Sequence, residues 1–145
     1  MSYVESTIGE MFLDARGWQT ILDRRPEIFT DMLPGASLGI LPKKEFASPV
    51  GTMLIWEKQI DKMAVFYQSF TGFQNTSVDL LMIADDAALV SLHSKAQDNP
   101  FYEMREQIRN GNILYYVMKT KNELLALGYE ELIDVLGIPF LGACR

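Results

Sequence analysis

The chain has few of the residues that carry chemistry in small proteins. Its 145 residues include one cysteine, Cys144, and one histidine, His93. A single cysteine excludes an internal disulfide framework, and a single histidine excludes a metal site built from several histidines. Glycine-rich phosphate loops, CxxC pairs, HExxH and GxSxG motifs are absent too. These absences argue against nucleotide-binding, zinc-binding and hydrolase functions, and we expect no cofactor.

Positive charge and long hydrophobic runs are also scarce. The chain has 13 basic and 19 acidic residues, which gives a net charge of −6. Nucleic-acid binding needs clustered basic residues that displace counterions, so we expect no nucleic-acid partner. No run approaches the roughly 18 apolar residues of a membrane span, and the N-terminus lacks the basic region of a signal peptide. The sequence predicts a cytoplasmic protein that does not associate with membranes.

The most informative stretch runs from Ile113 to Asp134. Its first six residues are apolar, which is typical of a strand buried on both faces of a parallel sheet. Thr120 and Glu123 then fit a capping box, in which hydroxyl and carboxylate satisfy two unpaired N–H groups of a helix start. Gly128 can take the left-handed conformation that ends a helix. Strand, polar loop and helix form the unit whose loop carries ligands in α/β proteins.

The N-terminal third looks different from the remainder. Apolar residues recur at spacings of three and four from Val4 to Leu22, and a second short helix is predicted over 27–33, so residues 2–33 are expected to be helical. The next 17 residues, 35–51, hold several glycines and prolines and read as a linker. We therefore expect a helical arm and linker over residues 1–50 and an α/β domain over 51–145.

The α/β domain contains three segments that read as strands followed by helices. The first, residues 52–73, has two possible structures: a strand followed by a helix from Asp61, or a β-hairpin. A buried strand over 78–84 and a helix from Asn99-Pro100 come next, and a short strand over 135–141 closes the chain. Successive β-then-α units predict a small, mostly parallel sheet flanked by helices. The carboxyl ends of its strands would gather Glu57-Lys58, Asp85-Asp86 and Met118–Lys121 at one rim.

Residues 52–143 resemble the DsrE/YchN-like family of small sulfur-relay proteins. The resemblance rests on TMLIWEKQIDKMAVFYQSF, on VDLLMIADDAALVSL, and on MREQIRNGNILYYVMKTKNELLALGYEELIDVLGIPFLG. It implies a flavodoxin-like parallel domain, assembled into trimers or hexamers, that carries persulfide on a loop cysteine. Met118 stands where that cysteine is expected, and a thioether can form neither a thiolate nor a persulfide. The resemblance therefore implies a non-catalytic member.

The predicted function is that of a DsrE-like homo-oligomer that binds a partner protein or a small anionic ligand, with a link to sulfur metabolism. No catalytic or metal-binding residue is predicted. The candidate ligand-binding residues are Met118, Lys119, Thr120, Lys121, Asp85 and Asp86. The lysines could instead be solvated loop residues, and the aspartates could end a strand or hold Mg²⁺ or Ca²⁺ with Glu57. The alternative function is a small acidic α+β interaction protein, such as an immunity protein.

Overall fold

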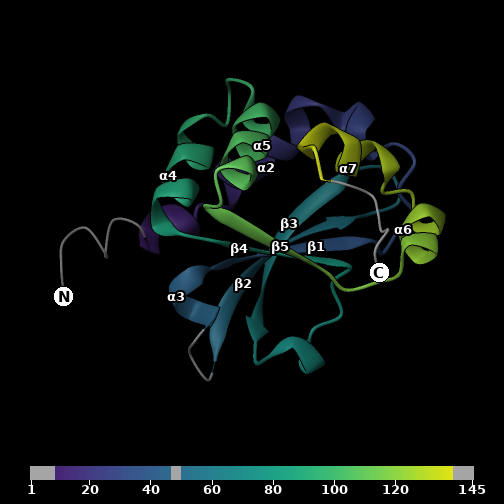
Figure 1. Ribbon diagram of the computed structural model, residues 1–145. Coiled ribbons are helices and arrows are strands. Elements are labelled where there is room, and N and C mark those ends of the chain that lie inside the picture. The colour runs from purple at the N-terminus through teal and green to yellow at the C-terminus, as the bar shows by residue number, and fades with distance from the viewer. Residues whose placement is uncertain (1–8, 47–49, 139–145) are drawn as a thin grey trace.

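The computed structural model describes residues 9–46 and 50–138, and these form a five-stranded mixed sheet (Figure 1). The strands are β1 (Ser37–Pro42), β2 (Gly51–Lys58), β3 (Met63–Phe70), β4 (Leu80–Ala84) and β5 (Ile113–Val117). Their order across the sheet is β3-β2-β1-β4-β5. Only β1 and β4 are parallel, and the other three neighbouring pairs are antiparallel.

Helices cover the two faces of this sheet unequally. The α-helices are α2 (Ala15–Arg24), α3 (Lys43–Phe46), α4 (Asp86–Ser94), α5 (Pro100–Arg109), α6 (Lys121–Leu127) and α7 (Glu130–Leu136). Two short 3-10 helices are η1 (Pro26–Phe29) and η2 (Phe73–Asn75), and residues 9–12 are also helical. Figure 1 shows α2, α4, α5 and α7 on one face and the short α3 on the other. We call these the helical face and the open face.

Two apolar clusters lie on the two faces. The larger one fills the space between the sheet and the helices, and it contains the fully buried rings of Trp18, Trp56, Phe101 and Tyr129. The smaller cluster lies on the open face and consists of Leu41, Met53, Ile55, Phe70, Val78, Leu81 and Ile83. Because side chains alternate along a strand, β1, β2 and β4 contribute to both clusters. Their nearly continuous hydrophobic sequences follow from that double burial.

The prediction of a mostly parallel sheet is wrong. Strand β5 runs antiparallel to β4, with Leu80 opposite Val117 and Ala84 opposite Ile113. Burial on both faces makes a strand apolar whatever its direction, so the pattern could not reveal orientation. The DsrE/YchN-like resemblance required a parallel flavodoxin-like sheet, and this topology overturns it.

The segment expected to be a linker contains the centre of the sheet. Strand β1 lies within residues 35–51 and pairs with β2 on one side and β4 on the other. Residues 52–73 adopt the hairpin alternative, with Lys58 opposite Met63. Residues 27–33 form only the end of η1, and residues 135–136 belong to α7 rather than to a strand. Residues 1–8 and 139–145, with Cys144, lie outside the described residues.

The helix ends follow their local signals. Thr120 caps α6 through the predicted capping box, in which its hydroxyl accepts from the Glu123 N–H and Glu123 accepts from the Thr120 N–H. Gly128 ends that helix in the left-handed conformation. Pro100 opens α5, as predicted. None of the described helices has the length and apolar character needed to cross a bilayer.

Candidate functional site

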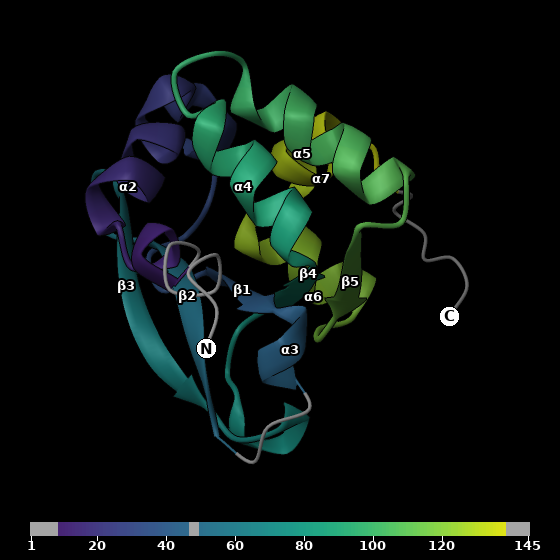
Figure 2. The same cartoon turned by 90° about the vertical axis from the view of Figure 1, so that its left-hand side faces the viewer.

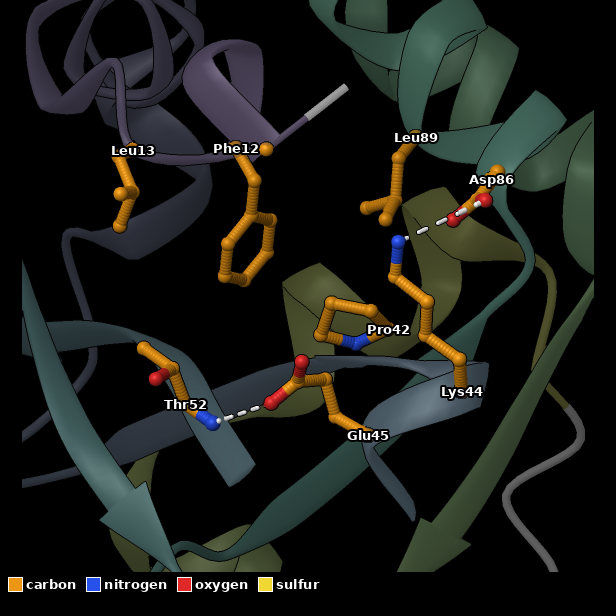
Figure 3. Close-up of a pocket in the computed structure, with 9 residues that line it drawn as sticks. Phe12, Leu13, Pro42, Lys44, Glu45, Thr52, Asp86 and Leu89 are labelled. Atoms are coloured by element: carbon orange, nitrogen blue, oxygen red, sulfur yellow. Dashed lines mark hydrogen bonds and ion pairs between the residues drawn. The ribbon is translucent and has the colours of Figure 1, made fainter. Parts of the chain in front are cut away.

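A pocket lies at the carboxyl ends of the parallel strands β1 and β4. Pro42 and Ala84 are neighbours in the sheet, and the chain leaves them into α3 and α4 on either side. The space between has a volume of about 170 Å³. It is lined by Gly9, Phe12, Leu13, Pro42, Lys44, Glu45, Thr52, Asp86 and Leu89 (Figure 3). Ligands of α/β proteins bind beyond such strand ends, and we call this the strand-end pocket.

The charged groups of the strand-end pocket lie at its rim. The Lys44 Nζ is 4.0 Å from Asp86 Oδ2, and the two side chains are 48% and 40% exposed. Glu45 Oε1 accepts a hydrogen bond from the Thr52 N–H at 2.8 Å. One lysine and two carboxylates leave an excess of one negative charge. Figure 3 shows Phe12, Leu13 and Leu89 reaching into the opposite side, so the pocket combines an apolar wall with a charged rim.

The structure separates the predicted site residues into two groups. Asp86 lines the strand-end pocket, and Asp85 caps α4 by accepting from the Ala88 N–H at 2.9 Å. Met118–Lys121 follow β5 at the opposite end of the sheet, because β5 is antiparallel to β4. The five-residue strands between the two ends span roughly 16 Å. The predicted rim that would gather all these residues therefore does not form.

The proposed carboxylate metal site does not assemble either. Glu57 pairs with Ser37 at the beginning of β1, whereas Asp85 follows the end of the parallel strand β4. Among the residues that the structure describes, no group of three or more histidine, cysteine, aspartate or glutamate side chains could hold a metal ion.

The residues after β5 have structural contacts. The Met118 N–H donates to the Asp79 carbonyl at 2.9 Å, and its side chain packs against the open-face cluster. Thr120 caps α6, and its backbone N–H holds the pKa of Glu123 below the usual range. Ligand binding by Met118, Lys119 or Lys121 stays a prediction.

His93 has a partner that the sequence did not indicate. Its Nε2 lies 2.8 Å from Asp14 Oδ2, and its ring meets Trp18 edge-on. Hydrogen bonds from His93 and from the Gly17 N–H lower the pKa of Asp14. A Cβ at Gly17 would lie 2.7 Å from His93 Nε2, so glycine makes room for this pair. Within residues 9–46 and 50–138, no hydrogen bond joins His93 to a hydroxyl or thiol.

Two buried polar side chains hold segments distant in the sequence together. The Tyr129 hydroxyl donates to Asp79 at 2.6 Å, and the Ser37 N–H donates to the same carboxylate oxygen at 3.0 Å. Burial, and then Asp79, raise the pKa of Tyr129 far above the usual range. Lys58 donates to the carbonyls of Phe29 and Met32 at 2.7 and 3.1 Å. These contacts give buried polar groups hydrogen-bond partners within the protein.

Aromatic rings gather on the open face of the sheet. Phe46 of α3 contacts Phe70, Phe73 and Tyr116, with ring centroids 5.4 to 6.4 Å apart. Phe46, Phe73 and Tyr116 remain 37–38% exposed. We call these four rings the aromatic cluster. Apolar patches of this kind mark interaction surfaces when they are large enough.

Comparison with known proteins leaves the function to be argued from these residues. No family model matches the chain, and no curated protein matches its sequence. It is similar to a crystal structure of sterol carrier protein 2, with a TM-score of 0.43, 12% identity, and coverage of 85% of this chain and 90% of that chain. It is also similar to a conserved hypothetical protein from Thermus thermophilus, described as a possible sterol carrier protein, with a TM-score of 0.40 and 13% identity over 84% of this chain and 77% of that chain. Both likenesses are distant, and neither is to a sulfur-relay protein.

Proposed function

We propose that the protein is a binding protein that holds a small amphipathic molecule in the strand-end pocket. The observation that carries this proposal is the pairing of an apolar wall with exposed charges in a pocket between α3 and α4. Its volume of about 170 Å³ is smaller than the roughly 300–1,000 Å³ of pockets for drug-sized ligands. A short apolar chain or a small ring with one polar head is the kind of molecule that fits.

The charges favour a positively charged head group. The Asp86 carboxylate makes a long 4.0 Å contact with the Lys44 ammonium, and both side chains are partly exposed. An ammonium group near Asp86 and Glu45 would balance the excess negative charge of the rim. A carboxylate head group would meet two carboxylates and one lysine, so we expect it to bind less tightly than an amine. This order replaces the anionic ligand that the sequence predicted.

Calorimetric titration with two probes of equal chain length tests the proposal. Hexylammonium is expected to bind more tightly than hexanoate, because the rim carries more negative than positive charge. Asp86→Asn should weaken hexylammonium binding about tenfold, the effect of losing one charged hydrogen bond of roughly 1.4 kcal/mol. Lys44→Met should leave hexylammonium binding unchanged or tighter.

The control is Glu106→Gln, which removes a carboxylate from α5 that does not line the pocket. It should not change the titration. Equal binding of both probes, or binding that Asp86→Asn and the apolar-wall variant Leu89→Asn leave intact, would rule out this pocket as the binding site.

A second candidate function is protein–protein interaction, as in an immunity protein. The aromatic cluster favours it, because aromatic residues are enriched at the centres of interfaces. A co-purified partner that is retained by the wild type and by Val90→Asp, but lost from Phe73→Asp, would support this function. Val90 is exposed on α4 on the helical face, so it controls for the added charge. Equal retention by both variants would argue against the aromatic cluster.

A further inference from the structure

The two edge strands of the sheet, β3 and β5, differ in the hydrogen bonding of their outward backbone groups. At the β3 edge, the Gln19 side chain of α2 donates to the Met63 carbonyl at 2.9 Å and accepts from the Val65 N–H at 3.2 Å. One amide side chain thus takes the place of a neighbouring strand. Such devices prevent edge-to-edge association of sheets. Figure 2 shows α2 beside β3 at one end of the sheet and β5 at the other.

At the β5 edge, backbone groups face outward and have no hydrogen-bond partner among the residues that the structure describes. The Asp85 N–H donates to the Asn112 carbonyl at 3.1 Å, and the Met118 N–H donates to the Asp79 carbonyl at 2.9 Å. The backbone N–H and C=O groups of residues 112 and 118 therefore point toward β4. Because direction alternates along an antiparallel strand, Ile113, Tyr115 and Val117 point away from it. No described residue donates to or accepts from their outward N–H and C=O groups.

The sequence of β5 does not discourage pairing. Ile113–Val117 contains no charged residue and no proline, the residues that usually protect an edge. Its composition of isoleucine, leucine, tyrosine and valine favours strands. Leu114 and Val117 are 46% and 49% exposed. A bare apolar edge of this kind is a surface that another strand can cover.

We propose that β5 pairs antiparallel with β5 of a second copy of this chain, about a two-fold axis at Tyr115. The outward residues are spaced evenly around Tyr115, so Ile113 of each copy would lie opposite Val117 of the other. Leu114 would lie opposite Tyr116, which brings exposed apolar side chains together. The two five-stranded sheets would join into one continuous sheet.

A second copy fits this edge better than an unrelated strand. A two-fold axis requires the same patch to complement itself, and the spacing about Tyr115 does so. Each copy carries a net charge of −6, and an uncharged strand lets two such copies meet without placing like charges opposite each other. This dimer replaces the trimer or hexamer expected from the DsrE resemblance, and it is independent of the strand-end pocket.

Light scattering after size exclusion tests the dimer. At about 100 µM, well above typical dimer dissociation constants, the wild type should have twice the 16.5 kDa chain mass. Val117→Lys adds a charge at the edge and should give a monomer. Val90→Lys, a valine with 45% exposure on α4, should remain a dimer. A wild-type monomer, or a Val117→Lys dimer, would overturn the proposal.

A disulfide crosslink tests the register of the proposed β5–β5 pair without relying on a variant that breaks the dimer. Opposing hydrogen-bonded residues have Cα atoms about 5.5 Å apart, within the range of a disulfide. In a Cys144→Ser background, Tyr115→Cys should form a disulfide-linked dimer under mild oxidation, and Ser69→Cys on β3 should not. Far-UV circular dichroism confirms folding of each variant. Folded Tyr115→Cys that stays uncrosslinked would reject the register centred on this residue.

Discussion

At the scale of single residues, Tyr129 joins the C-terminal helices to the sheet. Its hydroxyl donates to Asp79, which also accepts from Ser37. Tyr129→Phe leaves one oxygen of a buried carboxylate without that donor, so we expect a loss of about 1–3 kcal/mol in unfolding free energy. Urea denaturation at pH 7 measures it.

The same variant has a pH signature. Burial and Asp79 raise the pKa of Tyr129 from 10.0 in the folded state. The stability that this shift contributes is fully present below about pH 10 and is lost as the pH rises, because the unfolded tyrosine ionises first. The wild type should therefore lose stability above pH 10 more steeply than Tyr129→Phe. Some slope should remain in the variant, because burial raises the pKa of Tyr67 to about 12.

Substitutions at two glycines can distinguish the cost of backbone strain from the cost of steric overlap. Gly128 and Gly111 have φ angles of 88° and 82°. A Cβ at Gly128 would overlap the Asp31 carbonyl oxygen, whereas a Cβ at Gly111 meets nothing within 4 Å. Gly111→Ala should cost roughly 1–2 kcal/mol from strain alone. Gly128→Ala should cost more than about 3 kcal/mol, because backbone must also move. Thermal unfolding of both variants compares them, and equal losses would contradict the overlap.

At the scale of elements, the capping box of α6 gives a local test. Thr120→Ala removes the hydroxyl that accepts from the Glu123 N–H, so we expect a loss of about 1 kcal/mol. Thr20→Ala is the matched control, because the Thr20 hydroxyl donates to the Arg16 carbonyl one turn earlier and does not cap the helix. It should be neutral or slightly stabilising. Chemical denaturation distinguishes the two, and similar losses would show that the cap contributes little.

The elements that sequence predicted well are those with local signals. Thr120 with Glu123, and Asn99 before Pro100, marked helix starts that the structure confirms. Strand direction has no such signal, because it depends on which distant segment lies alongside. Of the residues that line the strand-end pocket, the sequence indicated Asp86, because it follows a recognisable strand. It did not indicate Lys44, which lay in the expected linker. Asp14 directly precedes α2 and could have been proposed as its N-cap. Its contact with His93 spans 79 residues and has no local signal.

At the scale of the whole molecule, the central position of β1 predicts one cooperative unit. Trp18 on α2 and Trp56 on β2 lie on opposite sides of the expected boundary at residue 50, yet both are buried in the same cluster. Fluorescence of Trp56 in Trp18→Phe, and of Trp18 in Trp56→Phe, should give the same unfolding midpoint as circular dichroism of that variant. An earlier transition seen by Trp18 alone would instead support a separable N-terminal arm.

The parallel pairing of β1 with β4 also affects which strand is exposed in the nascent chain during translation. A nascent chain that has emerged from the ribosome as far as Phe70 holds the three-stranded meander of β1, β2 and β3. One side of β1 stays open until Leu80–Ala84 emerge, since β4 is its other neighbour. The chain must therefore carry an exposed apolar strand during that interval, when strands of nearby nascent chains can pair with it. Slower translation between residues 70 and 84 would lengthen that exposure, and holding chaperones would protect the protein most at this point.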